Sequence, residues 1–178
     1  MPGGGSTRGR IIFVVIGLVV LIILVAVIAG LLNSGKKSSV EQLRSIALQQ
    51  AEISRVAGIG VMNARGSEAR NLAITTQLSL QSDQTTTVAL LADQKVKLGP
   101  KNFLAAKNPK TDSLLTDATE RNQFDEVFVK ELTSQLAVYQ KDVKAVYETA
   151  KSDSTRQALA TTFKNSQVLL SSSPPQTN

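Results

Sequence analysis

Residues 124–150 read FDEVFVKELTSQLAVYQKDVKAVYETA, and this stretch decides the fold class of the chain. Its apolar side chains recur every three or four residues, which places them on one face of an α-helix. The stripe consists of Phe124, Phe128, Leu132, Leu136, Tyr139, Val143, Val146 and Ala150. A helix with such a face has to bury it against other helices, so the stretch predicts one member of a helical bundle.

Upstream of this helix the same spacing predicts a helical hairpin. The first helix covers Ser39 to Ala64, and Ser38-Ser39-Val40-Glu41 fits a capping box at its start. The second covers Ser67 to Val96, and the very short connection makes the two helices antiparallel. In this connection we expect Gly66 as a left-handed C-terminal residue and Ser67 as the N-cap of the second helix.

The remaining segments complete a bundle over residues 39–170. Gly99-Pro100 and Asn108-Pro109 indicate a loop from Lys97 to Lys110. The helix that contains residues 124–150 then begins at Thr111 or Asp112, with a kink near Asn122 left open. A fourth helix, capped by Asp153 or Ser154, runs to Leu170, and residues 171–178 are predicted to be a disordered tail. The predicted fold is all-α, an antiparallel four-helix bundle.

An uncharged apolar run, IIFVVIGLVVLIILVAVIAGLL, occupies Ile11 to Leu32. As a helix it spans about 33 Å, enough for a hydrocarbon core of about 30 Å. It exceeds the apolar part of a cleaved signal peptide, about 7 to 15 residues. We therefore predict a transmembrane signal anchor at 11–32, between a short polar tail at 1–10 and a hinge at 33–38. The basic residues on its two sides are nearly balanced, and the short tail favours an extracytoplasmic bundle.

Composition excludes many kinds of catalytic site. The chain has no Cys, His or Trp, which removes thiol chemistry, Ser-His-Asp triads and histidine metal sites. The acidic residues nearest to the apolar stripes, Glu52, Asp83, Asp125 and Glu131, are scattered, so we expect no metal and no cofactor. The net charge of +6 comes with only 4 % aromatic residues, which argues against a nucleic-acid partner. We predict that the protein is not an enzyme.

Two smaller features have structural interpretations. Asp83 lies one turn from Leu80 and from Thr87, close to the apolar stripe of its helix, and a buried carboxylate needs a partner. It would either pair with a Lys or Arg of a neighbouring helix or reach water. The glycine-rich run from Gly58 to Gly66 lacks the spacing of a phosphate loop, and we interpret it as close helix packing followed by a helix end.

A lysine-rich segment between the second and third helices is the candidate site. Helices of about 39 Å and 45 Å, running out and back, would return this segment to the membrane surface. Lysines near an anionic surface attract it, and an apolar pair can enter the interface. The alternative is a solvated loop. The predicted membrane-contact residues are Lys36, Lys37, Lys95, Lys97, Lys101, Phe103, Leu104, Lys107 and Lys110.

Two pairs of short sequences resemble a bacterial ferritin-like four-helix family of unknown function. They are Ala51-Glu52-Ile53-Ser54-Arg55-Val56-Ala57 with Ser67-Glu68-Ala69-Arg70-Asn71-Leu72-Ala73, and Phe124-Asp125-Glu126-Val127-Phe128 with the long helix through Tyr139. The resemblance covers about 130 residues and implies a four-helix fold. Members of the family typically carry a His on each of two helices. The corresponding positions here are near Leu80 and Leu136, so the resemblance implies no metal site.

These features together predict a single-pass, membrane-anchored, extracytoplasmic helical bundle with a structural or interaction role. The expected partners are membrane lipid and another protein of the cell envelope. A ligand-binding sensor-type subunit that works with a partner, and a divergent ferritin-like protein, are the alternatives. Ala26 and Gly30 form a small-xxx-small pair that could bring two spans together, but the sequence does not decide whether the protein is a homo-oligomer.

Overall fold

A computed structural model describes residues 39–174 of the chain. The described residues belong to one compact unit, Ser38–Asn178. The predicted tail, anchor and hinge at 1–38, and the last four residues of the predicted C-terminal tail, lie outside the described residues. No helix among residues 39–174 is both long and apolar enough to span a membrane.

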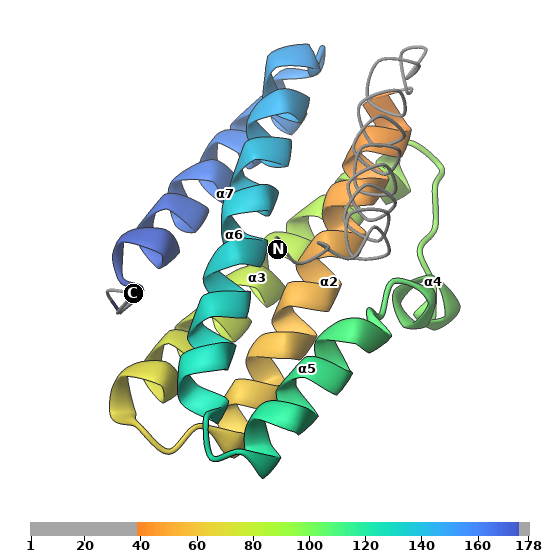
Figure 1. The fold of residues 1–178 in the computed structure, drawn as a ribbon. Coiled ribbons are helices and arrows are strands. Elements are labelled where there is room, and N and C mark those ends of the chain that lie inside the picture. Colours follow the sequence, from red (N-terminus) through yellow and green to blue (C-terminus); the bar gives the residue numbers. More distant parts are fainter. Residues whose placement is uncertain (1–38, 175–178) are drawn as a thin grey trace, which may run out of the picture. The chain divides into compact units, whose positions relative to one another are not determined.

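Residues 39–174 contain helices and no strand, which confirms the all-α prediction (Figure 1). The helices are α2 (Ser39–Asn63), α3 (Ser67–Asp93), α4 (Pro100–Ala105), α5 (Pro109–Glu120), α6 (Phe124–Thr149) and α7 (Asp153–Ser171).

The four long helices form the predicted bundle. α2 and α3 make an antiparallel hairpin, and α6 and α7 make another. Between the hairpins, α4 and α5 carry the chain from the end of α3 back to the α2–α3 turn, so α6 starts beside that turn. α2 contacts α6 and α3 contacts α7. The result is a four-helix bundle with one long crossover connection.

The stripe of α6 forms the centre of the core. Phe128, Leu132, Leu136, Tyr139 and Val143 are fully buried. The Phe128 ring stacks on Phe124 with centroids 5.5 Å apart, and its other neighbour is the backbone of α2 at Gly60. A Cβ atom at Gly60 would lie 2.1 Å from Phe128 Cζ. This contact confirms the interpretation of the glycine-rich run as close helix packing.

The predicted helix from residue 111 to 150 is wrong in one respect, because it is two helices. Asn122 adopts a φ of 55°, in the left-handed region. The amide of Asn122 donates to Thr119 O, and the amide of Gln123 donates to Ala118 O. These two hydrogen bonds form a Schellman motif, which terminates α5. The chain therefore breaks between α5 and α6, where the sequence suggested at most a kink.

The predicted loop at 97–110 is also wrong, because it contains α4 and the start of α5. Pro100 and Pro109 are the first residues of these two helices, where proline loses no hydrogen bond. The Asn108 side chain accepts from the amide of Lys110 at 3.0 Å, and the Asn102 side chain accepts from the amide of Gly99 at 2.9 Å. The Gly-Pro and Asn-Pro pairs are thus helix starts.

The predicted caps need correction too. Gly66 has a φ of −74° and is not left-handed, and Ser67 is the first residue of α3. The α2–α3 turn is capped instead by Asp125 of α6. The Asp125 carboxylate accepts from the amides of Arg65 at 3.0 Å and Gly66 at 2.6 Å. At α7 the cap is Ser152, whose hydroxyl accepts from the amide of Thr155.

A second Schellman motif ends α3 and leads to a stability prediction. Lys95 has a φ of 62°, and Val96 donates to Leu91 O at 2.9 Å. The left-handed conformation costs an L-residue about 1–2 kcal/mol, and glycine adopts it freely. Lys95→Gly should therefore raise the free energy of unfolding by about 1 kcal/mol. Urea unfolding measures this change, and an equal gain from Lys97→Gly would show that the cause is not the left-handed conformation.

Candidate functional site

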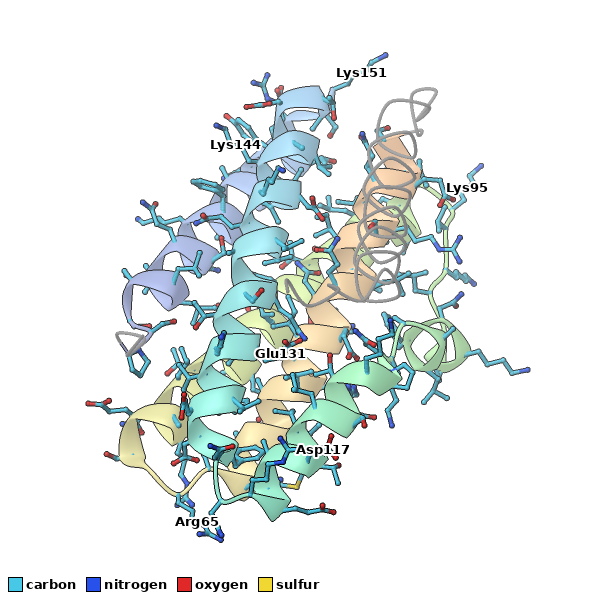
Figure 2. The ribbon with its side chains drawn as sticks, in the orientation of Figure 1. Arg65, Lys95, Asp117, Glu131, Lys144 and Lys151 are labelled. Carbon is cyan, nitrogen blue, oxygen red and sulfur yellow. The ribbon has the colours of Figure 1, made fainter. Side chains whose placement is uncertain are left out.

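The end of the bundle at which α2 begins, here called the α2-start end, combines several segments. A cleft of about 210 Å³ is lined by residues from the start of α2, the end of α3 and the α6–α7 turn, among them Ser39, Gln94 and Lys151. Lys95 and Lys97 follow α3 directly and are exposed. Figure 2 shows Lys95 and Lys151 projecting outward at this end, whereas Arg65 lies at the opposite end. Three exposed lysines are therefore near the point where the chain enters α2.

The rest of the lysine-rich segment lies elsewhere, beside the central turns of α2 (Figure 1). Ala106 and Asn108 line a groove of about 400 Å³ together with Leu48 and Glu52 of α2. The structure thus separates the nine predicted residues. Lys95 and Lys97 follow the end of α3, Lys101, Phe103, Leu104, Lys107 and Lys110 lie along the side of the bundle, and Lys36 and Lys37 are outside the described residues.

Chain geometry explains this separation. The five residues from Lys95 to Gly99 can span at most about 17 Å when extended. Leu48 lies nine residues into α2, about 14 Å from Ser39. A short extended segment therefore brings α4 to the middle of α2 before α5 begins. On α4, the side chain of Leu104 is 72 % exposed, whereas Phe103 is half-buried.

Charged side chains fix the crossover to α2. Arg55 donates from Nη1 to Asp112 at 2.7 Å and from Nη2 to Glu52 at 2.7 Å, while Lys107 Nζ lies 2.7 Å from the second oxygen of Asp112. Glu52 also accepts from the amide of Asn108 at 3.1 Å. Hydrogen bonding to Lys107 and then Arg55 lowers the pKa of Asp112, and hydrogen bonding to Glu52 raises the pKa of Arg55. Lys107 is therefore engaged within the protein.

This cluster predicts the effect of removing Arg55. Arg55→Ala would leave Asp112 and Glu52 without their bridge, and we expect a loss of about 1–2 kcal/mol in the free energy of unfolding. The crossover should also become easier to cleave by trypsin at Lys101, Lys107 and Lys110. Mass spectrometry of timed digests measures both the rate and the sites. Arg44→Ala, which removes a contact to Glu41 at 3.7 Å in the first turns of α2, should leave the rate unchanged; equal acceleration by both variants would contradict the role of the cluster.

The four acidic residues nearest to the stripes each have a structural partner. Glu52 binds Arg55, and Asp125 caps the α2–α3 turn. Glu131 accepts from Thr111 at 3.2 Å and from Gln135 at 2.7 Å, which ties α5 to α6. Asp83 accepts from Asn165. Within residues 39–174 no group of three or more acidic side chains could hold a metal ion.

A polar layer crosses the bundle core at mid-height. Asp83 of α3 accepts from Asn165 Nδ2 of α7 at 2.8 Å, so its partner is an amide and not the predicted Lys or Arg. Gln50 of α2 donates to the Tyr139 hydroxyl of α6 at 2.8 Å. Burial raises the pKa of Asp83, and the hydrogen bond from Asn165 opposes that shift. Burial also raises the pKa of Tyr139, so the phenol stays protonated.

A cleft of about 540 Å³ lies at the end opposite the α2-start end, between the α2–α3 and α5–α6 turns. Arg70 donates through two nitrogens to Ala64 O, and Arg65 contacts Asn122 Oδ1 at 3.4 Å. Asp125 is occupied by two backbone amides. Arg65 and Asp125 therefore connect the two turns, and Arg70 stabilises the α2–α3 turn itself.

Comparison with known proteins gives no relative from which a function could be carried over: no family model, no curated protein and no solved structure matches the chain. The Arg55–Asp112 link, the Asp125 cap and the Asn165 partner of Asp83 do not follow from the sequence pattern. The positions of Asp125 and Asp83 close to apolar stripes indicate buried hydrogen bonding, but they do not indicate the partners.

Proposed function

We propose that this protein is anchored in a membrane by Ile11 to Leu32, carries its helical bundle outside the cytoplasm, and acts by binding lipid or another envelope protein without catalysis. The observation that carries the proposal is the uncharged run of 22 apolar residues at 11–32, upstream of the helical bundle. The chain enters the bundle at Ser39, and exposed lysines lie near this point.

The absence of His and Cys and the structural use of the acidic residues near the core support a binding role. Glu52, Asp125 and Glu131 hold helices or turns together, and Asp83 is buried against Asn165. General acid–base chemistry needs a titratable group within reach of a substrate. Binding to a lipid or a protein requires no such catalytic group, only a suitable surface on the bundle.

Alkaline carbonate extraction of membranes that contain the full chain tests the anchor. The protein should stay in the membrane pellet, and a variant with Ile22→Arg and Val25→Arg should move to the supernatant because charges at the bilayer centre oppose insertion. A full-length wild-type chain that is released by carbonate would refute the anchor.

The placement of the lysines predicts which of them contribute to lipid binding. Each lysine near an anionic surface contributes about 1 kcal/mol, so Lys95→Gln with Lys97→Gln should weaken binding to phosphatidylserine vesicles roughly 30-fold. Co-sedimentation of residues 38–178, a compact unit, measures this affinity. Lys101→Gln with Lys110→Gln is the matched control, and its effect should be smaller. Equal losses in both variants, or binding that ignores lipid charge, would contradict the predicted orientation.

A further inference from the structure

The polar layer inside the bundle contains two acceptor atoms that no protein donor reaches. Within residues 39–174 neither Gln50 Oε1 of α2 nor Asp83 Oδ2 of α3 has a hydrogen-bond partner. Both residues lie in the core, since Gln50 is fully buried and Asp83 is 5 % exposed. Buried polar atoms in folded proteins are nearly always hydrogen-bonded, either to the protein or to ordered water. The two oxygen atoms therefore need a donor that the surrounding side chains do not supply.

The Tyr139 hydroxyl of α6 adds an unpaired donor to this layer. It accepts from Gln50 Nε2 at 2.8 Å, but its own proton has no acceptor among the described residues. Burial raises the pKa of Tyr139, so this proton stays on the phenol. Turning the Gln50 amide round would let Tyr139 donate to Oε1, but Gln50 Nε2 would then become the unpaired donor. In either orientation one donor is left over, and Asp83 Oδ2 still lacks one.

These groups lie close to one level of the bundle. Gln50 and Leu80 are equally far along the chain from Arg65 in the α2–α3 turn, so they face each other in the antiparallel hairpin. Asp83 follows Leu80 by less than one turn, about 4.5 Å along the helix axis. The charge of Asp83 also raises the pKa of Tyr139, as expected for a carboxylate near the phenol. One water molecule joins two oxygen atoms up to about 5.5 Å apart through two hydrogen bonds, which matches this spacing.

We propose that a water molecule is bound in the bundle core between Tyr139, Gln50 and Asp83. It accepts a hydrogen bond from the Tyr139 hydroxyl and donates one to Asp83 Oδ2 and one to Gln50 Oε1. Buried waters typically make about three such bonds to polar groups that lack other partners. A metal cation would satisfy the two acceptors but has no lone pair for the Tyr139 proton, so the balance of donors and acceptors favours water. The site belongs to the bundle and does not depend on the proposed membrane anchor.

Crystals of the full chain grown in a lipidic phase test the site directly. At high resolution we expect a separate density peak within about 3.0 Å of both the Tyr139 hydroxyl and Asp83 Oδ2. A direct hydrogen bond from Tyr139 to Asp83 Oδ2, with no peak between them, would overturn the proposal. A peak that gains anomalous scattering when sodium is replaced by rubidium would show a cation at this position, and it would overturn the proposal as well.

Relaxation of water oxygen-17 provides a second measurement in solution, because its frequency dependence counts water molecules held inside a protein. For the full chain in detergent, Asp83→Leu should remove the contribution of one such water, since leucine offers no acceptor. Gln50→Leu removes a partner on a different helix and should reduce the same contribution. Asp142→Leu is the matched control, because Asp142 bonds Gln49 away from this layer, and it should leave the signal unchanged. Equal signals from the wild type and from folded Asp83→Leu and Gln50→Leu would overturn the proposal.

Discussion

Gly60→Ala should destabilise the bundle by about 2–3 kcal/mol, although alanine is the better helix former. Propensity alone would favour alanine by about 1 kcal/mol within a helix. At this position the new methyl group would lie 2.1 Å from Phe128 Cζ, and Phe128 is fully buried and stacked on Phe124. Because the ring is fully buried, the added methyl group overpacks the core and this cost outweighs propensity. Urea unfolding of the two proteins measures the difference.

Two companion variants identify the cause of that loss. In Gly58→Ala the new Cβ would meet only the end of the Gln77 side chain at 3.0 Å, and that side chain can move. Gly58→Ala should therefore be neutral or stabilising. Phe128→Leu combined with Gly60→Ala should recover much of the stability, because the smaller side chain makes room for the methyl group. Equal effects of alanine at positions 58 and 60 would refute the close contact.

Asn165→Ala should lower the free energy of unfolding by about 2–3 kcal/mol at pH 7. The Asn165 amide donates to Asp83 Oδ1, and no other side-chain donor to this carboxylate is seen in residues 39–174. The variant leaves a buried carboxylate without its hydrogen bond, which costs more than the loss of a neutral pair. Asp83→Asn should instead stabilise the protein at pH 7 by about 1–2 kcal/mol, because it removes a buried charge.

The pH dependence of these variants has a definite sign. Burial raises the pKa of Asp83 above 3.8, so the folded state holds this proton more tightly than the unfolded chain. The contribution of Asp83 to stability is therefore full below pH 3.8 and is lost as the pH rises through the folded-state pKa. Asp83→Asn should remove this decline, and Asn165→Ala should be less harmful at pH 4 than at pH 7.

Asp112 is the control of opposite sign. Its pKa is lowered by Lys107 and Arg55, so its contribution is lost as the pH falls through that lowered pKa. Unfolding measured from pH 3 to pH 7 distinguishes the two residues. A penalty for Asn165→Ala that does not change with pH would contradict a charged, buried Asp83.

Much of the fold follows from local pattern. The stripe from Phe124 to Val146 lies in the core as its spacing predicts, and the short connection after Asn63 makes a hairpin. The errors occur at helix starts and helix ends. Asn122 and Lys95 adopt the left-handed conformation that sequence patterns associate with glycine, and the prolines at 100 and 109 open helices inside a segment predicted as a loop.

The side-chain contacts between helices could not be predicted from the sequence for a different reason. The Asp125 cap, the Arg55–Asp112 pair and the Asp83–Asn165 bond each join residues 57 to 82 positions apart. Such pairs depend on which helices become neighbours and in what register, and helical periodicity carries no information on either. The same limit explains why the lysine-rich segment was predicted as one surface, although α4 places part of it beside the middle of α2.

The proposed anchor makes a definite statement about the side of the membrane on which the bundle lies. Single-cysteine variants Ser6→Cys and Val138→Cys can be treated with a membrane-impermeant maleimide in intact spheroplasts and again after permeabilisation. We expect labelling of position 138 in intact spheroplasts and of position 6 only after permeabilisation. Labelling of position 138 only after permeabilisation would place the bundle in the cytoplasm and refute an extracytoplasmic bundle.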